Sequence, residues 1–192
     1  MRLPAPPLRS GGMIRVLGVD PGTRLVGWGV VEGSGGRFRA VAHGVIRADV
    51  RDHVALRLKA LAAGLRKVVA DYAPAEAAIE EVFHGKDARA AARIGEGRGA
   101  ALVVLAEAGI PVTGYANNVV KKAVTGGGRA GKERVQAMIR RVLALADAPE
   151  TFDAADALAL AVCHHQRRGL PRTSGGMSPR MAEAIRAARE GR

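Results

Sequence analysis

Three runs rich in β-branched residues, close together near the start of the chain, constrain the fold more than any other feature. They are IRVLGV (14–19), LVGWGVVE (25–32) and RFRAVAHGVIRA (37–48). The short segments between them are rich in Gly, Pro and Ser, which is typical of turns. Successive strands joined by short turns pair in an antiparallel manner. The chain is therefore predicted to begin with an antiparallel meander.

Beyond the meander, helical and strand-like patterns alternate. Apolar residues recur every three or four positions from Val54 to Tyr72, as on one face of a helix. The run AAIEEVF (77–83) indicates a buried strand, and PVTGYA (111–116) indicates a fifth strand. Further helical patterns cover residues 87–108, 132–145 and 153–165. This order predicts an α/β fold in which helices flank a mixed five-stranded sheet.

The length of the chain suits one domain with two extensions. The chain has 192 residues, which is enough for a single hydrophobic core. Residues 1–12 are rich in Pro and Gly and lack periodicity, so we expect a disordered N-terminal extension. Residues 167–192 carry seven Arg against two Glu and are predicted to form a basic C-terminal tail. The folded domain is expected to span residues 13–166.

Charge indicates the class of partner. The net charge of +12 attracts polyanions, so nucleic acid is the leading candidate. Only 3% of residues are aromatic, which argues against a platform on which bases stack. Apolar runs are too short for a membrane span and no signal peptide is recognisable, so cytoplasmic residence is expected. The single cysteine, Cys163, lies in an apolar run and is expected to be a core residue.

Four carboxylates interrupt apolar surroundings. Asp20 ends the first strand, Glu80 lies in the fourth, and Asp153 and Asp156 share one face near the start of the last helix. Acids at strand ends and at a helix start can converge on divalent cations. Ligation by oxygen alone favours Mg²⁺ or Mn²⁺. A pair of such ions supports phosphodiester hydrolysis, which is the chemistry this pattern predicts.

Each acid also has an alternative explanation. Asp20 precedes Pro-Gly and could initiate a turn. Glu80 adjoins Glu81, and the pattern does not decide which side chain faces inward. Asp153 could cap the last helix, with Asp156 favourable to the helix dipole. Their joint occurrence in a basic protein favours the metal site.

Four blocks of the sequence, taken together, resemble one family. They are VLGVDPGTRLVGWGVV, AIEEVFHGKDARAAARIGEGRGA, PVTGYANNVVKKAVTGGGRAGKERV and FDAADALALAVCHH. In order and spacing they are similar to the RuvC family of Holliday-junction resolvases over about residues 13–166. The resemblance implies a ribonuclease-H-like fold and a homodimer that nicks two strands of a four-way DNA junction, leaving 5′-phosphate and 3′-hydroxyl ends. It also implies two Mg²⁺ per active site, with Mn²⁺ as a substitute, and the RuvA and RuvB branch-migration proteins as partners.

The resemblance also assigns residue roles. The catalytic acids, which are the metal ligands, would be Asp20, Glu80, Asp153 and Asp156. Phe83 corresponds to an aromatic residue that stacks on or wedges between bases at the crossover, although a core aromatic is the alternative. Lys121 and Lys132 correspond to lysines that approach the scissile phosphates, and Lys122 could stand in for Lys121. The loop TGGGRAGK (125–132) is interpreted as a flexible segment that contacts DNA.

The glycines of the helix over 87–108 have two explanations. Relatives use this region at or near the dimer interface, so Gly95 and Gly99 are candidates for close packing between subunits. Close helix packing inside one subunit would explain them equally well.

Three other functions fit part of the pattern. The actin-like ATPases and sugar kinases also carry D-x-G-T in a first hairpin, but they need two such lobes. A non-catalytic junction-binding module would not need the acidic tetrad. Another nuclease of the same fold, acting on RNA–DNA hybrids or other branched DNA, is distinguished only by the resemblance.

Overall fold

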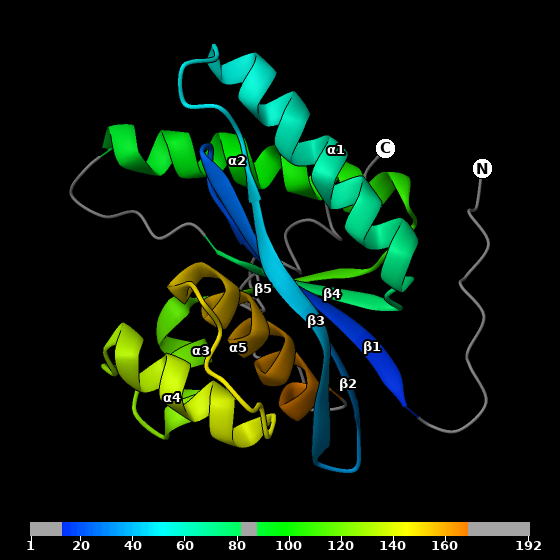
Figure 1. Cartoon of the computed structure of the whole chain (residues 1–192), viewed down its shortest axis with the longest axis vertical. Helices are drawn as coiled ribbons and strands as arrows, with labels where there is room; N and C mark the ends of the chain where they lie inside the picture. Colours follow the sequence, from blue (N-terminus) through cyan, green and yellow to red (C-terminus); the bar gives the residue numbers. More distant parts are fainter. Residues whose placement is uncertain (1–12, 82–87, 169–192) are drawn as a thin grey trace, which may run out of the picture.

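The computed structural model describes residues 13–81 and 88–168. Its centre is one five-stranded sheet of order β3-β2-β1-β4-β5 (Figure 1). The middle strand β1 pairs antiparallel with β2 and parallel with β4. The outer strands continue these two modes, since β3 is antiparallel to β2 and β5 is parallel to β4. The predicted mixed sheet is confirmed, with strands β1 (Ile14–Pro21), β2 (Leu25–Ser34), β3 (Arg37–Arg47), β4 (Glu76–Glu80) and β5 (Val112–Tyr115).

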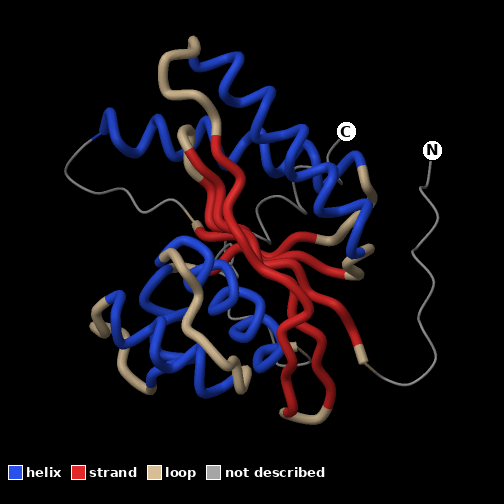
Figure 2. The backbone as a smooth tube through the Cα atoms, viewed as in Figure 1, coloured by secondary structure: helices blue, strands red, loops and turns tan. Residues whose placement is uncertain are grey.

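Helices cover both faces of the sheet, which gives three layers (Figure 2). One face carries α1 (Val54–Tyr72) and α2 (Ala88–Glu107). The other face carries α3 (Asn117–Thr125), α4 (Lys132–Val142) and α5 (Phe152–Arg167), and α5 contacts β1, β2, β3 and β4. Two clusters of buried apolar side chains result, one on each side of the sheet.

Several bounds differ from the prediction. The strand expected over 77–83 ends at Glu80, and the helix expected over 132–145 ends at Val142. Helix α3 was not predicted at all, because it is only nine residues long and buries only Val120 and Val124. Residues 1–12, 82–87 and 169–192 lie outside the described residues, and both extensions therefore remain predictions.

Strand alternation decides which residues meet α5. In β1, Leu17 and Val19 belong to the core under α1 and α2. Val16 belongs to the core under α5, and because side chains alternate along a strand, Asp20 faces the α5 side as well. In β4 the same rule separates Ala78 on the α5 side from Ala77 and Ile79 on the other.

Glycines on the sheet bring α5 unusually close. A Cβ added to Gly18 would overlap the carbonyl oxygen of Ala157, and one added to Gly27 would overlap the carbonyl oxygen of Asp153. On β2, a Cβ at Gly29 would lie 2.8 Å from the side chain of Leu158. The three glycines, which we call the glycine track, place the helix backbone directly on the strands.

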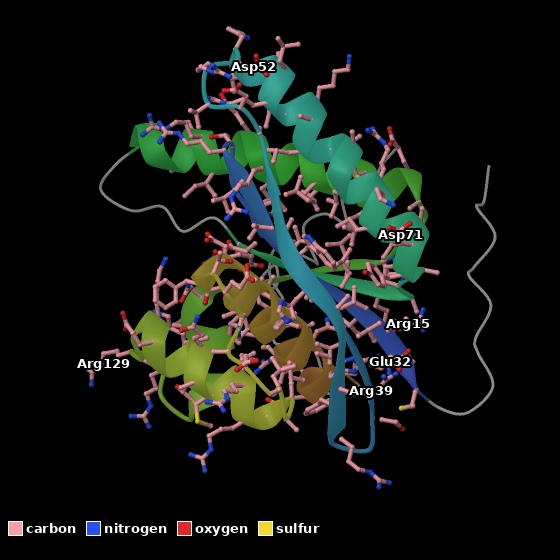
Figure 3. The ribbon with its side chains drawn as sticks, viewed as in Figure 1. Arg15, Glu32, Arg39, Asp52, Asp71 and Arg129 are labelled. Carbon is pink, nitrogen blue, oxygen red and sulfur yellow. The ribbon has the colours of Figure 1, made fainter. Side chains whose placement is uncertain are left out.

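Charged side chains on three neighbouring strands form ion pairs near the start of β1. Glu32 on β2 accepts hydrogen bonds from Arg15 on β1 and from Arg39 on β3, both at 2.6 Å (Figure 3). Although Glu32 is only 9% exposed, two guanidinium groups compensate its charge. In the described part of the chain, no helix is long and apolar enough to cross a membrane.

Candidate active site

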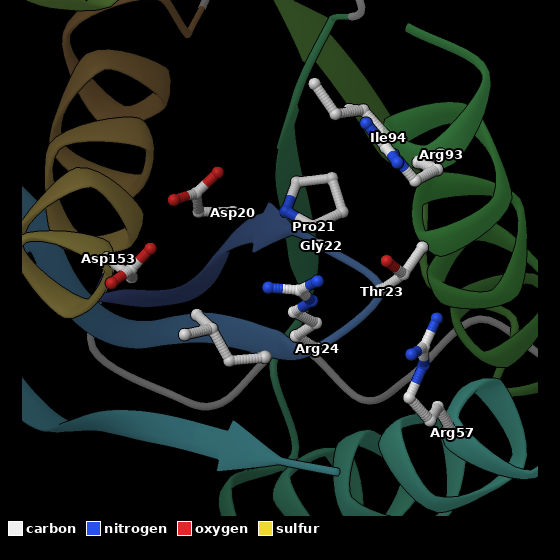
Figure 4. Close-up of a pocket in the computed structure, with 10 residues that line it drawn as sticks. Asp20, Pro21, Gly22, Thr23, Arg24, Arg57, Arg93, Ile94 and Asp153 are labelled. Carbon is white, nitrogen blue, oxygen red and sulfur yellow. The ribbon is translucent and has the colours of Figure 1, made fainter. Parts of the chain in front are cut away.

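The four predicted acids come from three elements, β1, β4 and α5, that meet at the carboxyl ends of the two strands. Asp20, near the end of β1, pairs with Gly27 of β2. Because the backbone of Asp153 lies on Gly27, the glycine track sets α5 beside Asp20. Glu80 is the last residue of β4, the parallel neighbour of β1. Figure 4 shows Asp20 and Asp153 on the same side of the adjoining pocket.

Asp20 is electrostatically coupled to the other three acids. Burial raises its pKa most, and the charges of Glu80, Asp156 and Asp153 raise it further, to about 8. A hydrogen bond between the Asp20 and Glu80 side chains contributes to the same shift. Mutual repulsion of this kind means that the site holds more negative charge than its protein surroundings compensate. Such a cluster favours a cation or a proton.

Asp156 lies where the acids meet two lysines. Burial, again the largest cause, and the charges of Glu80 and Asp153 raise its pKa to about 6. Lys132 and, less strongly, Lys121 act in the opposite direction. Both predicted lysines therefore lie near the acids. Lys121 is half-buried whereas Lys122 is exposed, which favours Lys121 as the lysine that faces the site.

The structure removes the three alternative explanations of the acids. Thr151, and not Asp153, caps α5, because its hydroxyl oxygen accepts a hydrogen bond from the Ala154 backbone at 3.2 Å. Glu81 turns away to β5, where its carboxylate lies against Gly114, while Glu80 bonds to Asp20. Asp20 lies within β1, paired with β2, rather than in the turn that follows.

Asn117 and Arg98 contact the site but were not singled out by the sequence. Asn117, the first residue of α3, donates its side-chain amide to Glu80 Oε1 at 2.7 Å. Arg98 of α2 donates its Nε to the Glu80 carbonyl oxygen at 3.1 Å. A signal for Asn117 existed, since polar residues that follow parallel strands gather at the same edge of a sheet.

The remaining predicted residues have different outcomes. Lys132 begins α4, and its Nζ lies 6.0 Å from the centre of the Phe152 ring. Phe83 lies outside the described residues, so its role stays a prediction. Cys163 is fully buried, as expected of a core residue.

The two glycines of α2 that were candidates for an interface between subunits are also described. A Cβ at Gly95 or Gly99 would meet no atom of residues 13–81 or 88–168 within 4 Å, so packing among those residues does not explain these glycines.

The donor set suits hard divalent cations, since it consists of carboxylate oxygens that repel one another. Among residues 13–81 and 88–168, however, no three Asp, Glu, His or Cys side chains are grouped tightly enough to form a finished metal site. Binding a cation therefore requires some of these side chains to turn toward a common point. The acids are neighbours, and their identity as metal ligands stays a prediction.

A pocket of about 480 Å³ opens beside the acids (Figure 4). Asp20 and Asp153 form one side. The remaining walls come from the β1–β2 turn, α1 and α2. They are formed by Pro21, Gly22, Thr23, Arg24, Leu25, Arg57, Arg93 and Ile94.

Comparison with known proteins gives a consistent result. The family model described as "Crossover junction endodeoxyribonuclease RuvC" matches residues 16–164. A protein of that description from Rhodopseudomonas palustris (strain BisB18) is 46% identical over 165 residues, which is 86% of this chain and 93% of the relative. Another, from Rhodospirillum rubrum, is 47% identical over 169 residues, which is 85% of this chain and 99% of the relative.

Solved structures agree. The Thermus thermophilus RuvC structure described as in complex with a Holliday junction substrate superposes with a TM-score of 0.73 at 35% identity, over 79% of this chain and 92% of that one. The yeast mitochondrial Holliday junction resolvase Ydc2, at 13% identity and a TM-score of 0.56, shares the fold. The match over nearly the whole described domain, in sequence and in structure, places this chain in the RuvC family of crossover junction endodeoxyribonucleases.

Proposed function

We propose that the protein resolves four-way DNA junctions by paired symmetric nicks, in homologous recombination and DNA repair. Family membership supports the activity. The observation that carries it is the meeting of Asp20, Glu80, Asp153 and Asp156, whose charges act on one another. The proposed place of action is the cytoplasm.

The reaction is hydrolysis of one phosphodiester in each of two strands. A water oxygen bonds to phosphorus, the bond from phosphorus to the 3′ oxygen breaks, and that oxygen takes up a proton. The products are a 5′-phosphate and a 3′-hydroxyl. Two Mg²⁺, for which Mn²⁺ can substitute, would activate the water and stabilise the leaving oxygen when bound. The four carboxylates would hold these ions.

The chain's own residues orient the acids and the phosphate. Asn117 fixes one oxygen of Glu80, and a side-chain hydrogen bond joins Glu80 to Asp20. Lys121 and Lys132, on the α3 and α4 side, place positive charge beside Asp156. We infer that these two lysines attract the scissile phosphate and offset charge that develops on its oxygens.

The junction itself requires two sites. The described part of one chain holds a single acidic cluster of this kind, and two symmetric nicks need two clusters related by a two-fold axis. We therefore propose a homodimer, and we propose that the exposed side of α2 forms part of its interface. Gly95, Gly99 and Val103 follow one another at intervals of four on that side, and Val103 is 53% exposed.

Two further parts of the proposal depend on the family resemblance. Phe83 would stack on a base of the opened crossover, and Phe83→Leu should then slow resolution without loss of fold. RuvA and RuvB would deliver the junction to the dimer. A base analogue whose fluorescence rises on unstacking, placed at the crossover, would report the Phe83 contact directly.

The deciding experiment compares binding with cutting. Asp20→Asn and Glu80→Gln keep side-chain size but remove the charges that bind cations. We expect both variants to bind a four-way junction and to leave it uncut in Mg²⁺. Glu81→Gln is the matched control, because Glu81 lies against Gly114 and away from the acids. It should cut at close to the wild-type rate.

A substrate panel tests the specificity. Four-way junction, linear duplex and RNA–DNA hybrid are offered to the wild-type protein in Mg²⁺, in Mn²⁺ and in chelator. The proposal expects preferential cutting of the junction and none in chelator. Preferential cutting of the hybrid would make the protein a different nuclease of the same fold. If Asp20→Asn loses junction binding and also loses its folded structure, as seen by circular dichroism, the acids have a structural role instead.

A further inference from the structure

The pocket beside the acids carries three arginines from three different elements. Arg24 comes from the β1–β2 turn, Arg57 from α1 and Arg93 from α2. In Figure 4, Arg57 and Arg93 lie across the pocket from Asp20 and Asp153, with Arg24 between them. Elements far apart in the sequence thus bring three positive charges to one pocket, which has a volume of about 480 Å³.

The three pocket arginines differ from those arginines that form ion pairs within the fold. Arg15 and Arg39 bond to Glu32, Arg51 to Asp49 and Arg66 to Glu107. Among the ion pairs of the described residues, none involves the three pocket arginines. Their charge is therefore available to a ligand.

Arg57 supports the same conclusion. Its Nε is buried and has no hydrogen-bond partner among the described residues. The hydrogen bond from its Nη1 to the carbonyl oxygen of Val50 is long, at 3.5 Å. A buried donor without an acceptor is costly, so the fold alone does not satisfy the Arg57 side chain, which lines the pocket.

The chemistry of the wall favours a phosphate. Guanidinium groups match the oxygens of a phosphodiester with paired N–H donors, and Thr23 adds a hydroxyl to the lining. The backbone around the pocket is held firmly. A Cβ added to Gly97 of α2 would lie 2.5 Å from the carbonyl oxygen of Gly22, so α2 packs directly on the turn that carries Arg24.

We propose that this arginine pocket is a subsite for a DNA backbone phosphate of the cut strand, next to the scissile phosphate. The proposal rests on the proposed function, and it adds the path that the cut strand follows past the acids. Lys121 and Lys132 lie on the α3 and α4 side of the acids, whereas the arginines lie on the α1 and α2 side. The cut strand crosses the acids from the lysines to the arginines. The cut strand is preferred over its partner strand because Asp20 and Asp153 line the same pocket.

The first measurement is the salt dependence of junction binding, with Ca²⁺ in place of Mg²⁺ to prevent cutting. Each phosphate contact contributes a slope of about −0.9 in a plot of log affinity against log salt. Arg24→Ala and Arg93→Ala should each make the slope shallower. The double variant should lose about one contact in total, because both arginines serve the same phosphate. Arg66→Ala, whose arginine is paired with Glu107, is the control and should keep the wild-type slope.

The second measurement locates the phosphate. Single methylphosphonate linkages, which are neutral, are placed in turn on each side of the scissile phosphate, in the cut strand and in the opposing strand. One linkage in the cut strand should weaken wild-type binding severalfold and leave the Arg24→Ala, Arg93→Ala protein unaffected. Arg57→Lys keeps the charge but loses the paired donors. The effect of this linkage on its binding should lie between the effects on the wild type and on the double variant.

The outcomes are distinct. If every linkage weakens the wild type and the double variant equally, or if the slopes agree, the pocket binds no phosphate. If the sensitive linkage lies in the opposing strand, the assignment to the cut strand is wrong. If the wild type neither binds nor cuts four-way junctions, the proposed function fails and not this subsite alone.

Discussion

Asn117 donates its side-chain amide to Glu80 Oε1 at 2.7 Å, so the first residue of α3 fixes the carboxylate at the end of β4. The contact occupies one Glu80 oxygen, and Glu80 also shares a side-chain hydrogen bond with Asp20. Glu80 is thereby held between α3 and β1. Groups that orient a metal ligand in this way commonly change metal affinity about 10- to 100-fold when removed.

Asn117→Ala should therefore raise the Mg²⁺ concentration needed for half-maximal cutting by about 10-fold or more. At saturating Mg²⁺ the rate should largely recover, because the acids themselves remain. Asn117→Asp should be worse than Ala, since it adds a charge beside Glu80. Metal titration of the cutting rate and of the thermal midpoint checks both. Asn118→Ala is the control, and an equal shift in that variant would mean that α3 was merely disturbed.

The acidic cluster predicts an unusual pH dependence in chelator. The pKa of Asp20 is about 8 in the folded chain against 3.8 in an unfolded one. Between these values folding takes up a proton, so the folded state loses stability as pH rises from about 4 to about 8. The loss is at most about 1.4 kcal/mol per pH unit for one proton.

Asp20→Asn should remove this loss. Its thermal midpoint in chelator should exceed that of the wild type, with a difference that grows from pH 5 to pH 8. Mg²⁺ should then stabilise the wild type and have little effect on Asp20→Asn. Thermal melts at three pH values, with and without Mg²⁺, test this. A difference that shrinks as pH rises would contradict the coupling of Asp20 to its neighbours.

The glycine track should not tolerate side chains. Gly18→Ala would force its methyl group into the Ala157 carbonyl and push α5 from the sheet. We expect a loss of about 1–3 kcal/mol of unfolding free energy, as for other overpacked cores. Cutting should fall further than stability explains, because Asp153 and Asp156 move with α5. Gly127→Ala, where a Cβ would meet nothing within 4 Å, is the control and should change stability by less than about 0.5 kcal/mol.

The proposed dimer can be tested on two equally exposed side chains. Val103 on α2 and Leu56 on α1 are both 53% exposed. A charge at Val103 should disrupt an interface on α2, so Val103→Glu should yield monomers by sedimentation. Leu56→Glu should remain dimeric. Monomers in both variants, or in neither, would remove α2 from the interface.

A mixing experiment tests whether two sites act together. Wild-type and Asp20→Asn subunits are mixed on a supercoiled plasmid that bears an extruded cruciform. Heterodimers should nick one strand and release open-circular DNA, whereas wild-type dimers should give linear product. If verified subunit exchange gives only linear and uncut plasmid, the shared-dimer mechanism is wrong.

Much of this fold could be predicted because its signals are local. Alternating and helical apolar patterns predicted the five strands and four of the helices to within a few residues. Helix α3 was missed because it is short and buries few side chains. Glu80 and Glu81 could not be separated by pattern, since both faces of β4 are covered and Ala77, Ala78 and Ile79 are all buried.

Local sequence patterns could not predict contacts between residues that are far apart in the sequence. The bond from Asn117 to Glu80 depends on β5 lying beside β4, which no short segment specifies. The arginine pocket likewise needs α1, α2 and the β1–β2 turn in place. Gly18 and Gly27 were visible as glycines, but their contact with α5 follows only from the packing.

The glycine track has a consequence for the growing polypeptide. Asp20 and Glu80 leave the ribosome well before Asp153 and Asp156, and domains commonly begin to fold during synthesis. A nascent chain that has formed its strands still lacks half of its acids. Those acids arrive together, when α5 settles on Gly18 and Gly27. The helix that completes the core on its side of the sheet is thus the same helix that completes the acidic cluster.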